Sequence, residues 1–247
     1  TLLLATHGYD LRAEHQVLRK LLEHRVDGIA LIGLDHSDDT YQLLISRDVP
    51  VVAAWSFSET SRISCIGSDN REAGRQAAKH LLSFGHRRVG LVFPPTQEND
   101  RARDRLEAVE LELRDAGIEI PDRWRVRSPY SVAHAKSVCR ELLSEHKDIT
   151  GLICGNDIIA QGAVSSAMQL GLRIPEDLSI VGIGDFAGSA DMFPALSTVQ
   201  IPAQQIGIQA GKYLVQSIAN SDVSEIVRRK MDVALKPRAT TGRAVRG

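Results

Sequence analysis

Two arginines, Arg101 and Arg105, stand four residues apart in a strongly charged segment near the middle of the 247-residue chain. In a helix, this spacing places both side chains on the same face. A guanidinium group is a planar donor that can hold a carboxylate, or two neighbouring hydroxyl oxygens, through paired hydrogen bonds. The pair therefore predicts a site for a small anionic or hydroxylated ligand. The alternative interpretation is a solvated face of a charged helix.

Two aromatic residues stand where expected strands end. Trp55 follows the apolar run 50–54, and Tyr130 comes shortly after the segment 124–126. A flat apolar wall beside a few charged groups is typical of a small-molecule pocket. Either ring could stack on a ligand, and ordinary core packing is the alternative for both.

Residues that could catalyse a reaction or hold a cofactor form no recognisable pattern. The eight histidines have no metal-ligand spacing among themselves or with the cysteines. Gly182 and Gly184 lack the third glycine of a dinucleotide-binding turn, and there is neither a phosphate-binding loop nor a Gly-x-Ser-x-Gly turn. The sequence therefore predicts no enzyme activity, no metal and no cofactor.

Strand and helix patterns alternate along most of the chain. Short apolar runs closed by turn residues predict strands at 2–5, 29–32, 50–54, 63–66, 88–93, 124–126, 149–154, 178–183 and 231–235. Apolar stripes at helical spacing predict helices at 11–25, 41–47, 70–84, 101–116, 131–145, 158–170 and 204–219. This alternation predicts an α/β fold with parallel strands. The basic tail from Pro237 is expected to fray.

The segment from Ile149 to Ile201 displays this pattern most clearly. Its first strand closes with Gly155-Asn156-Asp157, a helix follows, and the next strand ends at Gly184-Asp185. Ligands of open parallel sheets bind beyond the carboxyl ends of the strands. We expect Asn156 and Asp157 to support the strand end and cap the helix rather than to contact a ligand.

Several short motifs follow one another in a specific order and spacing. They are Asn156-Asp157-x-x-Ala160-x-Gly162-Ala163, Ile174-Pro175-x-Asp177, Val181-Gly182-Ile183-Gly184-Asp185 and Pro194-Ala195-Leu196-Ser197-Thr198-Val199. Further motifs are Val26-Asp27-Gly28-Ile29, Asn70-x-x-Ala73-Gly74, Leu82-x-x-Gly85-His86-Arg87-Arg88-Val89 and Ile206-Gly207. Together they resemble the effector-binding core of the lactose- and galactose-repressor (LacI/GalR) family over nearly the whole chain.

The resemblance implies two doubly wound parallel-sheet subdomains of the type I periplasmic-binding-protein-like architecture. Crossing strands would join them near 68–70, 200–202 and 229–232, with the ligand cleft between the subdomains. The N-terminal subdomain would comprise residues 1–69 plus 202–230, and the C-terminal subdomain residues 70–201 plus 231–247.

The chain departs from the family pattern at its beginning. The family has a DNA-reading helix-turn-helix and a hinge, and its core then opens with one more strand and helix than we find here. We therefore expect the first core strand and helix to be missing. Operator DNA would be contacted only through an N-terminal domain that is not in this chain.

The resemblance also implies roles for single residues. Arg105 matches the family's cleft arginine, and Asp69 lies where the family places a cleft acid, although Asp69 could instead cap the next helix. A further acid of the family is replaced by Gly184, with Asp185 beside it, as in the branch that includes gluconate-operon repressors. Two arginines and a missing acid predict a carboxylate ligand, for example the sugar acid gluconate. The predicted ligand-binding residues are Arg105, Arg101, Asp69, Trp55, Tyr130 and Asp185.

Composition limits the partners of the chain. A net charge of −1 gives no basic surface for nucleic acid. No apolar run approaches the ~20 residues of a membrane helix, and no signal peptide is recognisable. The cysteines Cys65, Cys139 and Cys154 are widely spaced, which favours reduced and partly buried thiols. We therefore expect a cytoplasmic location.

Function classes of three kinds can be compared. The first is the effector-binding core of a transcriptional repressor, which would form a homodimer with the helix from Ala73 to Leu82 as a candidate surface. The second is a periplasmic sugar-binding protein of the same architecture, which needs a signal peptide. The third is an enzyme, for which no catalytic constellation is found.

Overall fold

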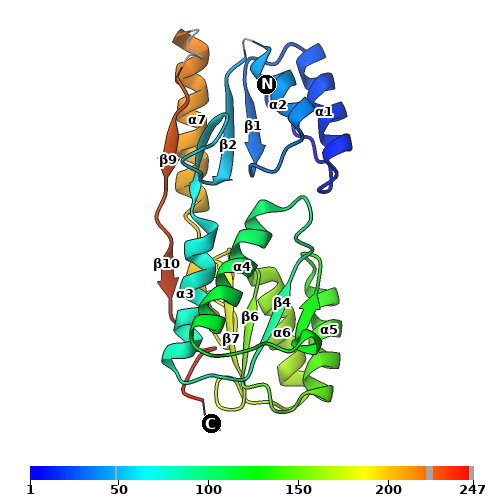
Figure 1. Cartoon of the computed structure of the whole chain (residues 1–247), viewed down its shortest axis with the longest axis vertical. Helices are drawn as coiled ribbons and strands as arrows, with labels where there is room; N and C mark the ends of the chain where they lie inside the picture. Colours follow the sequence, from blue (N-terminus) through cyan, green and yellow to red (C-terminus); the bar gives the residue numbers. More distant parts are fainter. Residues whose placement is uncertain (48, 221–224, 245–247) are drawn as a thin grey trace. The chain divides into compact units, whose positions relative to one another are not determined.

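The computed structural model describes residues 1–47, 49–220 and 225–244 of an α/β chain, as predicted (Figure 1). The chain divides into two compact units. The N-terminal unit comprises Thr1–Asp69, Gln97–Arg101 and Pro202–Asp232. The C-terminal unit comprises Asn70–Thr96, Ala102–Ile201 and Val233–Gly247. Residues 97–101 thus belong to the N-terminal unit, although the residues before and after them in the sequence belong to the C-terminal unit.

The N-terminal unit is built on a parallel sheet with the strand order β1-β2-β3-β9. Its elements are α1 (Leu11–Glu23), β1 (Ile29–Ile32), α2 (Asp38–Ile45), β2 (Val51–Ser56), β3 (Ser64–Ser68), α7 (Ala203–Asn220) and β9 (Arg228–Lys230). Side chains cap both early helices. Asp10 accepts hydrogen bonds from the backbone of Arg12 and Ala13 before α1, and Ser37 accepts one from Thr40 before α2.

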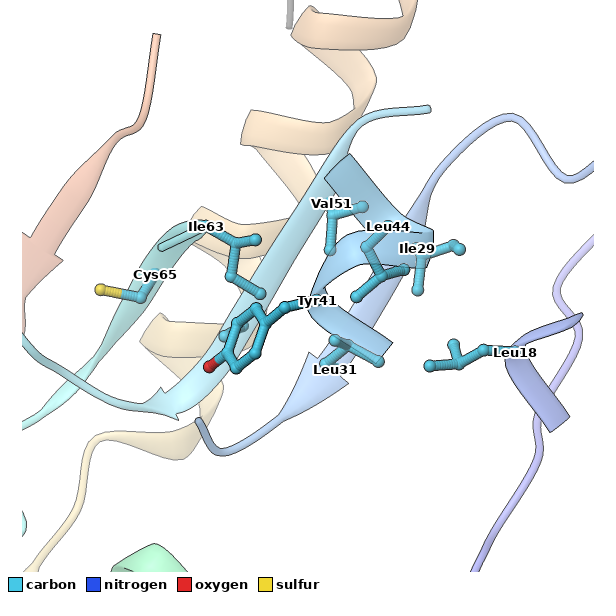
Figure 2. Packing of buried hydrophobic residues seen from close by; sticks show 9 residues of the cluster. Leu18, Ile29, Leu31, Tyr41, Leu44, Val51, Ile63 and Cys65 are labelled. Carbon is cyan, nitrogen blue, oxygen red and sulfur yellow. The ribbon is translucent and has the colours of Figure 1, made fainter. Parts of the chain in front are cut away.

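The two faces of this sheet are covered by different helices. On one face, Leu18 of α1 and Tyr41 and Leu44 of α2 pack with apolar residues of the first three strands (Figure 2). On the other face, Val52 and Ile66 pack against α7. β2 and β3 are therefore buried along nearly their whole length, whereas β1 alternates buried and exposed residues.

The C-terminal unit has a sheet with the order β10-β8-β7-β6-β4-β5, in which only β10 runs antiparallel to its neighbour. Its strands are β4 (Val89–Phe93), β5 (Arg125–Arg127), β6 (Gly151–Cys154), β7 (Ser179–Gly184), β8 (Ser197–Gln200) and β10 (Ala234–Lys236). Its helices are α3 (Asn70–Ser83), α4 (Asp100–Asp115), the short 3₁₀ turn η1 (Asp122–Trp124), α5 (Val132–Glu145) and α6 (Asp157–Gln169). The first two residues of α4, Asp100 and Arg101, belong to the N-terminal unit.

Glycines allow two helix pairs in this unit to approach closely. A Cβ atom on Gly74 of α3 would lie 2.2 Å from the carbonyl oxygen of Arg105 in α4. A Cβ atom on Gly162 of α6 would lie 2.7 Å from the carbonyl oxygen of Val132 in α5. Neither position can carry a side chain without separating the helices, which explains the glycines of the motifs around residues 74 and 162.

Two predicted strands are wrong. Residues 2–5 are not in a strand, and Leu2 and Leu4 are 81% and 87% exposed. An apolar run becomes a strand only when another strand pairs with its backbone, and none of the described strands does so here. The predicted strand 231–235 is replaced by two three-residue strands, β9 and β10, which join different sheets. β9 reads Arg-Arg-Lys, with all three residues exposed, and so carries no apolar pattern.

The described part of the C-terminal tail is held in place, contrary to the prediction that it frays. Thr240 donates from its hydroxyl group to the carbonyl oxygen of Ile180 at 2.7 Å and is fully buried. His80 Nε2 lies 2.8 Å from the hydroxyl group of Thr241. His86 Nε2 lies 3.0 Å from the carbonyl oxygen of Gly242.

The described residues include no helix that is long and apolar enough to span a membrane. Cys65, Cys139 and Cys154 are free and buried, as expected for reduced thiols. Burial raises the pKa of Cys139 to about 12 and raises the pKa of Cys154 well above its ordinary value. Both thiols are therefore poor nucleophiles in the folded chain.

The buried histidines make the stability of the C-terminal unit dependent on pH. Burial lowers the pKa of both His80 and His86 below the ordinary value of 6.5. The unfolded chain therefore binds protons that the folded chain excludes, and stability falls as the pH drops below 6.5. Each histidine contributes at most about 1.4 kcal/mol per pH unit to this loss.

Urea unfolding of a Trp55→Phe variant, followed through the fluorescence of Trp124, measures this effect. His86→Gln in the same background should show a shallower loss of stability between about pH 7 and pH 5. His134, which is exposed, provides the control: His134→Gln should retain the original slope. Identical slopes in all three proteins would contradict the interpretation.

Candidate functional site

In the N-terminal unit, polar groups gather around Asp100 at the carboxyl ends of β1 and β2. The carboxylate of Asp100 accepts hydrogen bonds from the backbone N–H of Leu34 at 2.9 Å and from the hydroxyl group of Ser56 at 2.6 Å. Arg101 Nη1 donates to Asp100 Oδ1 at 2.6 Å and to the carbonyl oxygen of Ile32 at 3.2 Å. These bonds attach segment 97–101 to the strand ends, where ligands of parallel sheets bind.

A cavity of about 220 Å³ opens beside Arg101 in this unit. It is lined by Ala5, Thr6, His7, Gly8, Tyr9, Glu14, Ile32, Asp35, Glu98, Asp100 and Arg101. Carboxylates outnumber basic groups in this lining, and Arg101 already forms an ion pair with Asp100. The cavity therefore offers many acceptors to a ligand with hydroxyl groups and a single guanidinium group to a ligand with a carboxylate.

Two other predicted residues of this unit lie close to strand ends. Trp55 is the second-last residue of β2, is half-buried, and has a φ of 75°. A positive φ is uncommon for a bulky residue and is typical of functional segments. Asp69 follows β3 and forms an ion pair with Lys230 Nζ at 3.3 Å.

In the C-terminal unit, Arg105 is 5% exposed and lies at the carboxyl end of β6. Its Nε atom donates to Asn70 Oδ1 at 2.8 Å, and its Nη1 atom donates to the carbonyl oxygen of Gly155 at 3.1 Å. Arg101 and Arg105 therefore share helix α4 but bind different groups. The two side chains were predicted to lie on one face of the helix, but they share no partner in these hydrogen bonds. Arg101 lies in the first turn of α4, where it reaches the end of β1.

Asp185 follows β7 and is held by two side chains of the same unit. Arg238 Nη2 donates to its Oδ1 atom at 2.7 Å, and Gln200 Nε2 donates to its Oδ2 atom at 2.9 Å. Gly184 precedes it with a φ of 142°, and a Cβ atom there would lie 2.6 Å from the ring of Phe186. This contact explains why the position matched to a family acid carries no side chain. Tyr130 lies half-buried in the loop between β5 and α5.

Asn156 and Asp157 have the supporting roles predicted for them. Asn156 is the N-cap of α6 and accepts a hydrogen bond from the backbone of Ile159 at 3.0 Å. Asp157 is completely buried. Its carboxylate accepts from the backbone of Phe186 at 3.0 Å, from the Ser189 hydroxyl group at 2.6 Å, and from the Thr198 hydroxyl group at 2.6 Å.

Sequence reasoning missed Asp100, Ser56, Glu14 and Arg238. Asp100 stands directly before a predicted ligand residue, so its position was a usable signal. The other three carry no local signal, because their partners lie 22 to 53 residues away in the chain. The described residues contain no group of three or more His, Cys, Asp or Glu side chains that could hold a metal ion.

Residues 78–241 match the family described as periplasmic binding protein-like domain. Curated relatives include the HTH-type transcriptional repressor PurR of Klebsiella pneumoniae subsp. pneumoniae, which is 28% identical over 222 residues. The alignment covers 89% of this chain and 65% of that repressor. PurR of Haemophilus influenzae is also 28% identical, with 90% and 66% covered. The chain thus spans about two thirds of the length of these relatives.

Solved structures of regulators resemble the whole chain. The transcription regulator GntR from Chromobacterium violaceum is 30% identical, with a TM-score of 0.89 over 98% of this chain and 88% of that chain. The transcriptional regulator CelR in complex with cellobiose is 27% identical, with a TM-score of 0.80 over 92% of this chain and 70% of that chain.

The buried carboxylate of Asp157 should be required for the stability of the C-terminal unit. Asp157→Asn keeps the shape but replaces one accepting oxygen by an NH₂ donor that faces other donors. We expect this change to lower the free energy of unfolding by about 1–3 kcal/mol, measured by urea unfolding. Asp191, which is exposed in the loop between β7 and β8, is the control, and Asp191→Asn should change stability by less than about 0.5 kcal/mol. Equal effects of the two substitutions would refute the role of Asp157.

Proposed function

Because the chain belongs to the periplasmic binding protein-like family and is an effector-binding core of the LacI/GalR type, we propose that it is the ligand-sensing and dimerisation core of a DNA-binding transcriptional repressor. The observation that carries the proposal is the likeness to the GntR regulator over 98% of this chain. The named relatives are transcriptional repressors, so the core binds a ligand and is not an enzyme.

The proposal assigns DNA contact to a part of the protein outside this chain. The PurR relatives extend beyond the aligned region, since only 65% of the Klebsiella protein is covered. The net charge of −1 agrees with a core that does not itself bind operator DNA. A regulator that acts on DNA works in the cytoplasm, which is where we place this protein.

The effector is a small sugar-like molecule, for which a sugar acid such as gluconate is our specific proposal. Two features support the acid: the buried guanidinium of Arg105 at a strand end, and Gly184 at a position where the family has an acid. The carboxylates around Arg101 favour a ligand that also carries several hydroxyl groups. A polyhydroxylated acid agrees with the features of each unit taken separately. Asp69 of the N-terminal unit and Asp185 of the C-terminal unit form ion pairs with Lys230 and Arg238, so a ligand that binds through either acid exchanges that pair.

Homodimerisation is the other specific part of the proposal. The helix from Ala73 to Leu82 is a weaker candidate surface than expected, because Ala73, Ala77 and Leu81 are buried inside their own unit. Apolar side chains that remain exposed on the C-terminal unit are better candidates: Val132, Met168 and Phe193, the last of which is 88% exposed.

A periplasmic sugar-binding protein of the same fold is the second candidate. The CelR–cellobiose complex is a regulator that binds a sugar, so sugar binding alone does not separate the two functions. The named relatives and neighbours are regulators, which favours the first proposal. A full-length protein that is monomeric and retains no affinity for DNA would favour the periplasmic alternative.

Thermal melting against gluconate, other aldonates, keto acids, purines, glucose and cellobiose tests the effector class. Binding to the folded state alone raises stability by about 2.7 kcal/mol at a hundredfold excess over the Kd, which gives a measurable shift in Tm. We expect a shift with gluconate-like acids. The shift should be lost in Arg105→Ala, because the buried guanidinium can no longer hold the carboxylate.

Arg114, which is exposed on the same helix, provides the matched control. Arg114→Ala should retain the full ligand-induced shift. The shift is compared within each variant, because Arg105→Ala also removes the bonds to Asn70 and Gly155 and lowers the Tm of the free protein. A shift with neutral sugars alone would keep the effector core and reject the sugar acid.

A further inference from the structure

His36 of the N-terminal unit has an unusual set of neighbours. Its side chain is 1% exposed, and that of Glu14 in α1 is 5% exposed. The Nδ1 atom of His36 lies 2.9 Å from Glu14 Oε2 and 3.0 Å from Glu14 Oε1. The Nε2 atom lies 3.1 Å from the carbonyl oxygen of Gly33. Both ring nitrogens of a buried histidine therefore face acceptor atoms.

These contacts cannot be satisfied by a neutral histidine and an ionised glutamate. A neutral imidazole has one N–H donor and one bare nitrogen. The carbonyl oxygen of Gly33 and an ionised carboxylate both only accept. With the proton on Nε2, the bare Nδ1 atom faces the carboxylate; with the proton on Nδ1, the bare Nε2 atom faces the carbonyl oxygen of Gly33. A buried contact of that kind is costly.

We propose that Glu14 and His36 share one additional proton in the folded chain. The reference is a neutral histidine beside an ionised glutamate, which together carry only the single ring proton. The proton lies between Nδ1 and the carboxyl group. The pair is either an imidazolium with a carboxylate or a neutral imidazole with a carboxylic acid. In both forms every polar atom of the pair has a donor matched to an acceptor.

The charged groups around the pair favour its retention of the proton. Glu14 and Asp35 line the cavity together with Asp100, Glu98 and the guanidinium of Arg101. His7 Nε2 approaches Glu14 Oε1 at 3.5 Å. From α2, the ring of Tyr41 packs edge-on against His36, and the guanidinium carbon of Arg62 lies 4.3 Å from the centre of the Tyr41 ring. Burial raises the pKa of Tyr41 to about 12, so this phenol adds no negative charge at neutral pH.

The proton changes the charge that the cavity presents to a ligand. With it, the lining and the adjacent His36 together carry one negative charge fewer than the acidic residues of the lining imply. If the proposed effector binds there, its carboxylate meets less repulsion than these acids alone would cause. This consequence rests on the proposed function, whereas the proton itself does not.

Nuclear magnetic resonance of the whole chain, labelled with ¹⁵N-histidine and ¹³C-glutamate, tests the proton directly without any ligand. His36→Asn and Glu14→Gln assign the two signals. At about pH 7.5, where an ordinary histidine is largely neutral, we expect one of two results. Either both nitrogens of His36 are protonated, or the Glu14 carboxyl group is. A bare nitrogen on His36 together with an ionised Glu14 would overturn the proposal.

His15→Asn is the matched control, since His15 follows Glu14 in the sequence and its Nδ1 atom lies 3.4 Å from the hydroxyl group of Thr40. It should leave the signals of His36 and Glu14 unchanged. The experiment involves no ligand, so failure of the effector panel and failure of the proton pair are separate outcomes.

Discussion

The carboxylate of Asp157 is the group on which the order of the C-terminal strand ends depends. It is buried completely, and its three donors come from the loop after β7 and from β8. A carboxylate removed from water requires such donors, so it fixes the chain that supplies them. The requirement extends to Gly182, where a Cβ atom would lie 2.3 Å from Asp157 Oδ1. One buried acid thus accounts for the glycine, serine and threonine that recur in the surrounding motifs.

The N-terminal unit also contains a carboxylate that accepts hydrogen bonds from separate segments, but one of its donors is charged. Asp100 also joins separate segments, through Leu34 and Ser56, but one of its donors is the guanidinium of Arg101. An ion pair at a strand end can exchange its internal partner for a ligand group, whereas the neutral donors of Asp157 have no such exchange available. Asp157 therefore has a structural role, whereas Asp100 lies where an internal partner can be exchanged for a ligand group.

Periodicity was sufficient to predict the α/β fold and most of its elements, because helices and strands covered by other elements carry their burial pattern in their own residues. It failed at residues 2–5 and 231–235, where the outcome depends on which strand is available for pairing. The site was less predictable for the same reason. Arg105 was identified through a motif, but its bonds to Asn70 and Gly155 span 35 and 50 residues, which no local pattern encodes.

The charged residues at the strand ends are already bound to internal groups, and this limits what their types imply about a ligand. Arg101 is paired with Asp100, and Arg238 with Asp185. A ligand carboxylate that displaces one of these acids exchanges one charge-assisted bond for another and leaves the displaced acid to find new donors. The net gain from the carboxylate alone is then small. Hydroxyl groups of a ligand, by contrast, can donate to carboxylate oxygens of the protein without displacing an internal partner. Affinity for a sugar acid would therefore come mainly from its hydroxyl groups, while selectivity for the acid depends on how readily the internal ion pairs exchange.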